Sequence, residues 1–344
     1  MQQPIILFGG ASFEHEISIV SAIGLHQAIG VRCEFVFLSS DHRFYLIDLI
    51  NMRADYFASG KFSRSTELFL ANGGFERKTL FGRTPIDCDV IISVVHGADG
   101  EDGTLAALFD FYNIAYLGPR IEASTLSYNK HLTKHLAIMA GVRTLPYEIV
   151  RRGEVVKTPY PYIMKPLRLG SSLGISVVKG ASDLDYAHDS AFEFDSEAIV
   201  EPYIASVREY NLAGCYADDW HLSVIEEPQK KEFLDFDQKY LDFTRTSKAK
   251  EADLDGNVAA AMREAFKRIY GVGFFGALIR CDFFVIDNEV YLNEINPVPG
   301  SLANYLFDNY ESALIALIEN LPRRKSITAS YNYIHSIRSQ KGKL

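Results

Sequence analysis

A lysine that precedes a glycine- and serine-rich segment is the first feature of the sequence with an evident chemical use. Lys165 stands just before the segment 168–174, RLGSSLG, and the apolar runs PYIMKP and ISVVKG flank this segment. The two runs predict a β-hairpin. Because small side chains let backbone N–H groups approach closely, its turn can cover phosphate groups while the ammonium adds positive charge. Taken alone, the pattern is equally typical of an ordinary surface hairpin.

Three side chains with oxygen atoms near the C-terminus could bind a metal ion. Glu294 and Asn296 are two residues apart in the segment FFVIDNEVYLNEINP, so they lie on one face of a predicted strand, and Asp282 lies on the preceding predicted strand. Two carboxylates and an amide oxygen are hard ligands that suit Mg²⁺ bridging nucleotide phosphates. Acidic strand ends are common, however, so the spacing alone favours an ordinary polar strand end.

Two short patterns match the motifs of other enzyme classes, but their context argues against both. The glycines at 271, 273 and 276 fit a dinucleotide fingerprint, yet they follow a predicted helix and precede a predicted strand, which reverses the order that this motif needs. The segment GSSLG fits a nucleophile elbow, but a strand pattern rather than a helix follows its serine. The sequence contains no P-loop signature, so a nucleoside triphosphate must be bound in another way.

The elements that must position these residues fall into three predicted parts. Residues 1–119 are predicted to form an open α/β (Rossmann-like) domain, residues 120–205 a central part and residues 206–344 a C-terminal part. Strands are predicted at 4–8, 33–39, 88–96, 198–204, 208–217, 220–228, 276–286 and 289–297, besides the hairpin. Helices are predicted at 17–29, 104–113, 125–141, 182–194 and 257–270. The later part is therefore α+β, with mixed or antiparallel sheets.

Composition narrows the class of protein. The net charge of −9 argues against binding to nucleic acid, which relies on clustered lysine and arginine. The four cysteines are far apart and include no CxxC pair, so neither disulfides nor a zinc site is predicted. No export signal precedes the first strand, and no apolar run is long enough to cross a membrane. We expect a cytoplasmic protein that acts on small molecules, with neither a nucleic acid nor a membrane as partner.

Taken in order, the motifs resemble the D-alanine–D-alanine ligases of the ATP-grasp superfamily. The matching segments lie between residues 5 and 307 and include FGGASFEHEISIVSA, HGADGEDGTLAALFDFYNIAYLG, NKHLTKHLAIMAGVRTLPY, PYIMKPLRLGSSLGISVVK, EPYIASVREYNLAG, LDFDQKY, IRCDFFV and NEINPVPGS. The resemblance implies an ATP-grasp fold and the ATP-dependent joining of two D-alanine molecules through a D-alanyl phosphate, for cell-wall precursor synthesis. It also implies two Mg²⁺ (or Mn²⁺) ions per site and a homodimer. By the same resemblance, residues 1–119 are the N-terminal substrate domain, residues 120–205 the central ATP-grasp subdomain, and residues 206–344 the C-terminal ATP-grasp subdomain with the metal and second-substrate site.

The resemblance assigns roles to individual residues. For ATP it implies phosphate contacts from Lys130 and Lys165, a covering loop with Ser171 and Ser172, adenine contacts from Glu201, Tyr203 and Ile204, a ribose contact from Glu209, and a lid at 227–246 with Lys239. For catalysis it implies Glu14, Ser171, Tyr240 and Arg280. For the two D-alanines it implies Glu14, His96, Arg280, Gly300, Ser301 and Tyr305, and for the metal ions Asp282, Glu294 and Asn296.

Several of these residues have a simpler interpretation when they are taken alone. Glu14 and Glu16 could cap the following helix, because acids are favoured in a first turn. His96 could be a partly buried residue at a strand end, and Tyr240 a packed loop aromatic. Lys134, on the same predicted helix face as the phosphate lysine four residues earlier, is expected to be a solvated charge.

One position departs from the pattern of the resembled family. A serine usually follows the last glycine of NEINPVPG by five residues and helps to hold the second substrate's carboxylate, whereas this chain has Tyr305 there. Either the Tyr305 hydroxyl replaces that serine, or backbone N–H groups and Ser301 hold the carboxylate.

Two rival functions remain open from the sequence. One is another ATP-grasp carboxylate–amine ligase, including a D-alanine–D-lactate ligase, although Tyr240 argues against the latter because the depsipeptide enzymes replace this tyrosine. The other is a nucleotide-binding module without catalysis, against which the complete set of lysines and metal ligands argues.

Overall fold

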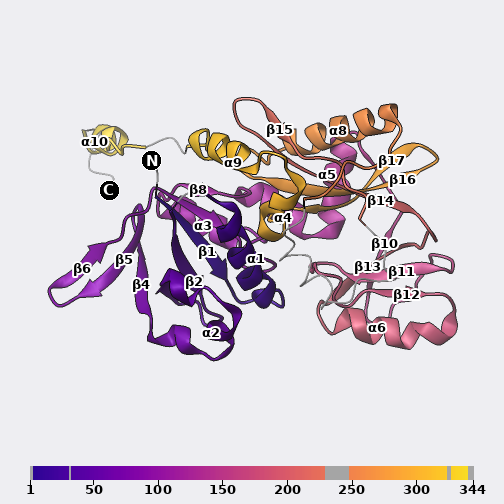
Figure 1. Cartoon of the computed structure of the whole chain (residues 1–344), viewed down its shortest axis with the longest axis horizontal. Coiled ribbons are helices and arrows are strands. Elements are labelled where there is room, and N and C mark those ends of the chain that lie inside the picture. Colours follow the sequence, from indigo (N-terminus) through magenta and orange to yellow (C-terminus); the bar gives the residue numbers. More distant parts are fainter. Residues whose placement is uncertain (1–2, 31, 229–247, 324–326, 340–344) are drawn as a thin grey trace.

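The computed structural model describes residues 3–30, 32–228, 248–323 and 327–339 (Figure 1). Its first sheet has eight strands in the order β6-β5-β4-β3-β2-β1-β7-β8. Their bounds are β1 Pro4–Gly9, β2 Glu34–Leu38, β3 Phe44–Ile47, β4 Thr66–Ala71, β5 Gly74–Thr79, β6 Gly82–Pro85, β7 Val90–Ser93 and β8 Tyr116–Leu117. β1 pairs in parallel with β2 and β7, and β7 pairs in parallel with β8. The successive pairs from β2–β3 to β5–β6 are antiparallel.

Of the strands in the parallel half of this sheet, β1, β2 and β7 agree with the prediction, whereas β8 and the antiparallel strands were not predicted. The predicted helices are present as α1 (His15–Ala28) and α3 (Thr104–Phe111). The antiparallel strands were not predicted because β3 is an apolar run of only four residues and β6 is exposed throughout, so neither gives a clear strand pattern. A short helix, α2 (Ala54–Ala58), lies between them.

The second sheet carries the predicted phosphate hairpin. It has four antiparallel strands in the order β10-β13-β11-β12, with bounds Glu148–Arg151, Glu197–Pro202, Tyr162–Pro166 and Ser176–Val178. β11 and β12 form the hairpin, with Tyr162 opposite Val178 and Met164 opposite Ser176. Helix α6 (Leu184–Phe192) covers one face of the sheet (Figure 1). The predicted hairpin is therefore confirmed.

The third sheet carries the predicted metal ligands. Its order is β15-β14-β16-β17-β9, with bounds Trp220–Leu222, Arg208–Tyr216, Ile279–Ile286, Glu289–Asn296 and Arg143–Thr144. All of its pairs are antiparallel except β17 with β9. Helix α8 (Gly256–Gly271) precedes β16, so the three glycines at 271–276 connect a helix to a strand, as predicted.

The single helix predicted at 125–141 is wrong, because the chain breaks there. Two helices, α4 (Ile121–Tyr128) and α5 (Lys130–Met139), meet at Asn129. Asn129 has an extended backbone, and its side chain accepts hydrogen bonds from the backbone N–H groups of His131 and Leu132, so it is an N-cap. The break makes Lys130 the first residue of α5.

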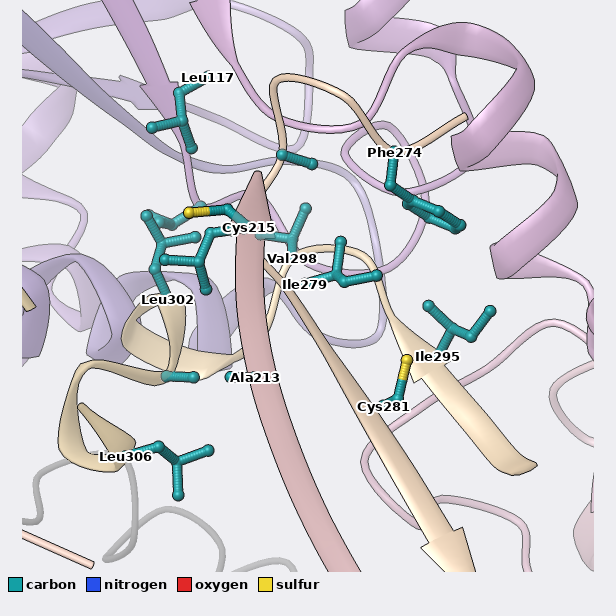
Figure 2. Close-up of a cluster of buried hydrophobic side chains, with 14 of the residues drawn as sticks. Leu117, Ala213, Cys215, Phe274, Ile279, Cys281, Ile295, Val298, Leu302 and Leu306 are labelled. Atoms are coloured by element: carbon teal, nitrogen blue, oxygen red, sulfur yellow. The ribbon is translucent and has the colours of Figure 1, made fainter. Parts of the chain in front are cut away.

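One hydrophobic core joins the first sheet to the third. It runs from Phe8 in β1 through Cys281 in β16 to Leu317 in α9 (Tyr310–Glu319). Figure 2 shows Leu302 and Leu306, from the 3₁₀ segment η4 (Gly300–Leu306), among the buried side chains of this cluster. The last described helix is α10 (Asn332–Ser339). None of the helices in the described ranges is long and apolar enough to span a membrane.

Candidate active site

A contact between the first sheet's domain and the hairpin loop forms one side of the site. Glu14, just before α1, is buried, and its Oε1 accepts a hydrogen bond of 2.5 Å from the Ser171 hydroxyl. A Cβ atom on Gly97 or Gly170 would lie 2.9 or 2.8 Å from the Glu14 carboxylate oxygens, so only glycine permits this approach. The Glu14 side chain makes no capping hydrogen bond to α1, so the simpler capping interpretation is wrong for this residue.

The two predicted phosphate lysines lie close to each other. Lys130 Nζ donates to the carbonyl oxygen of Leu169 in the hairpin loop, and Lys165 Nζ donates to Glu201 Oε2 at 2.9 Å. Burial lowers the pKa of Lys130, and the neighbouring Lys165 adds to this effect. Burial would also lower the pKa of Lys165, but Glu201 and Glu294 outweigh it and raise the pKa. The carboxylates of Glu201 and Glu294 therefore act on both ammonium groups.

Lys134 is not the solvated charge that the sequence suggested. Only 2% of its side chain is exposed, and its Nζ forms an ion pair with Glu201 Oε1. The expectation was wrong because the partner, Glu201, is 67 residues away in the sequence and lies on β13 of the second sheet. Lys134 therefore belongs to the charged cluster around Lys165.

The predicted metal ligands meet at the end of the β16–β17 pair. Asp282 lies opposite Glu294 and Arg280 opposite Asn296. The Arg280 guanidinium donates two hydrogen bonds to the Asp282 carboxylate, of 2.7 and 2.9 Å, and Asn296 Nδ2 donates a third of 3.0 Å. Burial raises the pKa of Asp282, while Arg280 opposes this effect.

This cluster has the donors that a Mg²⁺ ion needs. Since Asn296 uses Nδ2 toward Asp282, its amide oxygen is directed elsewhere, and each carboxylate oxygen can accept more than one bond. Within the described residues, no group of three or more His, Cys, Asp or Glu side chains forms a ready metal site. Two carboxylates and an amide fit a Mg²⁺ ion whose remaining ligands come from phosphates and water.

His96 is buried three residues after the end of β7, near Arg280. Its Nδ1 donates a 2.7 Å hydrogen bond to the Val94 carbonyl, which leaves Nε2 as the acceptor of a neutral ring. Burial lowers the pKa of His96 to about 4, and the Arg280 charge also acts in that direction. The imidazole is therefore uncharged at neutral pH.

The residues expected around the second substrate lie in and beside η4. Ser301, Leu302 and Ala303 have positive φ angles of 48°, 49° and 52°, which is strained for residues other than glycine. The Ser301 backbone N–H donates to Ser21 Oγ at 2.5 Å, and its hydroxyl donates to the Ser21 carbonyl at 3.2 Å. Burial raises the pKa of Tyr305, and the Arg280 guanidinium opposes this effect. Tyr305 thus lies beside the arginine, whereas Ser301 bonds to α1.

The remaining predicted site residues that the structure describes lie in or just after strands of the second and third sheets, in the hairpin loop and in η4. Tyr203 and Ile204 directly follow β13, and the Tyr203 backbone N–H donates to the Pro161 carbonyl at 3.0 Å. Glu209, in β14, acts electrostatically on Lys165. Ser172, next to Ser171, also has a positive φ angle in the hairpin loop. Gly300 is the first residue of η4. Lys239 and Tyr240 lie outside the described residues.

Glu101 is an ionisable residue at this site that was not selected from the sequence. Burial raises its pKa well above the ordinary value, and Glu14 and Glu294 add to this effect while Lys130 opposes it. Glu101 therefore interacts electrostatically with Glu294 of the third sheet as well as with Glu14 and Lys130. Its position in the segment HGADGEDG, five residues after His96, was the available signal.

This chain is similar to known D-alanine–D-alanine ligases in both sequence and structure. The model of the D-ala D-ala ligase N-terminus matches residues 3–119, and that of the D-ala D-ala ligase C-terminus matches residues 136–313. A D-alanine–D-alanine ligase of Campylobacter concisus is 55% identical over 98% of both chains, and one of Helicobacter hepaticus is 51% identical over 98% of this chain and 99% of its own. A crystal structure of the Helicobacter pylori ligase is 46% identical, with a TM-score of 0.85, over 94% of this chain and 100% of its own.

Proposed function

The chain belongs to the D-alanine–D-alanine ligase family, and from this premise we propose how its own residues carry out the reaction. The protein is an ATP-dependent ligase of the ATP-grasp fold that joins two D-alanine molecules for peptidoglycan synthesis. The observation that carries the assignment of residues is the Ser171–Glu14 hydrogen bond, because it joins the loop over the phosphates to the first domain.

In the first step, the carboxylate of one D-alanine attacks the γ-phosphorus of ATP, an O–P bond forms and the bond to ADP breaks. Glu14 receives the ammonium of this D-alanine, and the adjacent Ser171 hydroxyl holds the Glu14 carboxylate in place. Lys130 and Lys165 offset the charge of the phosphates. Arg280 stabilises the phosphoryl group in transfer, since its bonds to Asp282 fix the guanidinium before substrate arrives.

In the second step, the amine of another D-alanine attacks the acylphosphate carbon, and the C–O bond to phosphate breaks. This amine must lose a proton to become the nucleophile. His96, which the resemblance places near the first D-alanine, is uncharged, so it adds no positive charge that would repel that substrate's ammonium group. The Tyr305 hydroxyl beside Arg280 takes the place of the usual serine toward the substrate carboxylate. Because Ser301 bonds to Ser21, we assign it a supporting role for the turn at Gly300.

Mg²⁺, or Mn²⁺ in its place, would be held by Asp282, Glu294 and Asn296. When bound, such ions neutralise phosphate charge and polarise the transferred group. The same proposal includes two metal ions per site and a covering role for Ser172. It also includes adenine contacts from Glu201, Tyr203 and Ile204 and a ribose contact from Glu209. Lys239 and Tyr240 have the roles in the lid that the resemblance implies. We further propose a cytoplasmic homodimer and domain boundaries near residues 119 and 205.

Release of ADP tests the function directly. We expect Mg²⁺-dependent ADP formation that requires D-alanine, with D-alanyl-D-alanine as the product by mass spectrometry. Reactions with L-alanine, and without any amino acid, serve as controls. Equal turnover with L-alanine would contradict the assignment of the substrate, and ADP formation without an amino acid would indicate a simple ATPase.

A further inference from the structure

Three buried side chains form a charged cluster that the mechanism above uses only in part. Lys134 Nζ pairs with one oxygen of the Glu201 carboxylate, and Lys165 Nζ pairs with the other at 2.9 Å. The exposed fractions of the three side chains are 2% for Lys134, 3% for Glu201 and 10% for Lys165. The cluster joins helix α5 to strands β13 and β11.

Stability alone does not explain a lysine at position 134. Removing two charges from water is costly, and apolar residues of similar volume often replace buried ion pairs without loss of stability. Glu201 already has a cationic partner in Lys165. A second buried lysine on the same carboxylate therefore needs another reason.

The charges of the cluster supply that reason. Burial would raise the pKa of Glu201, but Lys165 and Lys134 outweigh it and lower the pKa to about 2, so Glu201 is ionised. An ionised Glu201 with Lys165 alone would be a neutral pair. Glu294 and Glu209 also act on Lys165, which increases the negative charge around it. Lys134 adds one positive charge, so the three-residue cluster is cationic when all of its members are ionised.

We propose that Lys134 is a positioning residue for ATP, which neutralises Glu201 so that the positive charge of Lys165 remains available to the phosphates. This inference rests on the proposed function, in which Lys165 contacts the phosphates of ATP. Lys134 itself is covered by protein and acts through Glu201 rather than by touching the nucleotide.

Removing the charge tests this role. We expect Lys134→Met to raise KM for ATP and Kd for Mg-ADP roughly tenfold to a hundredfold, where each tenfold step corresponds to about 1.4 kcal/mol. KM for D-alanine should change far less, because the cluster belongs to the nucleotide side of the site. Lys134→Gln, whose amide can still donate to Glu201, should show the same rise, which separates charge from hydrogen bonding. Lys179→Met, at an exposed position beyond β12, is the matched control.

A double variant makes the test specific for charge. Because Glu201 also has a proposed adenine contact, E201Q alone is the reference: if Lys134 acts only through the Glu201 carboxylate, adding K134M to E201Q should leave KM for ATP unchanged. Thermal unfolding shows that each variant is folded. Wild-type affinity in folded K134M and K134Q, or a further rise in KM for ATP when K134M is added to E201Q, would overturn the role of Lys134 and leave the proposed function intact. Failure of the wild-type protein to form ADP with D-alanine would instead overturn the proposed function.

Discussion

Replacing Gly170 with alanine should disturb the first-substrate subsite without disturbing the fold. A Cβ atom at Gly170 would lie 2.8 Å from Glu14 Oε1, about 0.6 Å closer than an ordinary van der Waals contact. Gly170 does not have a positive φ angle, so alanine can adopt its backbone conformation. The whole effect of the substitution therefore falls on the Glu14 carboxylate and on its hydrogen bond with Ser171.

The size of the effect follows from this geometry. The nearest atoms are at the end of a side chain rather than in the backbone, so the Glu14 carboxylate can retreat by about 0.6 Å and the free energy of unfolding should change by only about 1 kcal/mol. A displacement of about 1 Å in a positioning group can cost up to about a hundredfold in rate. We expect KM for the first D-alanine to rise roughly tenfold to a hundredfold, while KM for ATP changes less.

Initial rates of ADP release, with D-alanine varied at saturating ATP, measure this effect. Gly180→Ala is the matched control, because an added Cβ there meets no atom within 4 Å and its φ of −172° suits any residue. The control also carries the entropic effect of losing a glycine. If folded Gly170→Ala uses D-alanine as the control does, the Glu14 carboxylate does not position the first substrate, and that assignment must be withdrawn.

Three further predictions concern the other side of the site. The depressed pKa of His96, about 4 in the folded protein, means that the unfolded chain binds the extra proton first as pH falls, so stability should decrease between about pH 6.5 and 4 by up to about 3 kcal/mol. Urea unfolding of wild type and His96→Asn checks this, and an equal loss in both would refute it. Arg280→Lys keeps the charge but loses the paired bonds to Asp282, so kcat for ADP release should fall about 10²- to 10³-fold; a smaller change than tenfold would remove Arg280 from the transition state. Asn296→Ala should raise the Mg²⁺ concentration needed for half-maximal rate about tenfold and reduce stability by only about 1 kcal/mol, and an unchanged Mg²⁺ titration would remove it from the metal site.

The sequence predicted those parts of the fold in which a clear apolar pattern is bounded by residues that favour turns. Strand β1 and the hairpin of β11 and β12 are apolar runs bounded by glycine, and the structure has them where they were expected. The break at Asn129 could not be seen in the same way. The segment around it has a continuous helical pattern, and only the capping hydrogen bonds from the Asn129 side chain reveal two helices.

The register of the third sheet illustrates what pattern alone leaves undetermined. Glu294 and Asn296 were correctly placed on one face of a strand, but nothing local could show that Asp282 lies opposite Glu294 and Arg280 opposite Asn296. The pairing shifts after Asp282, where a β-bulge occurs near Asn293. This residue accepts a hydrogen bond of 3.5 Å from Lys165 Nζ, a contact across two sheets that only the folded chain brings about.

The two lysines of α5 show why burial of a charge is a property of the fold and not of the helix. A spacing of four residues places Lys130 and Lys134 on one helix face, but it does not say whether that face meets water or protein. Here both ammonium groups bond to residues of the central hairpin region, one to the Leu169 carbonyl and the other to Glu201. Helix α5 leads into β9, which is a strand of the third sheet. The two lysine bonds therefore connect the third sheet, through α5, to the second sheet and its hairpin loop. Substitution of either lysine should therefore loosen the hairpin as well as change the charge, and the comparison of K134M with K134Q distinguishes these two effects.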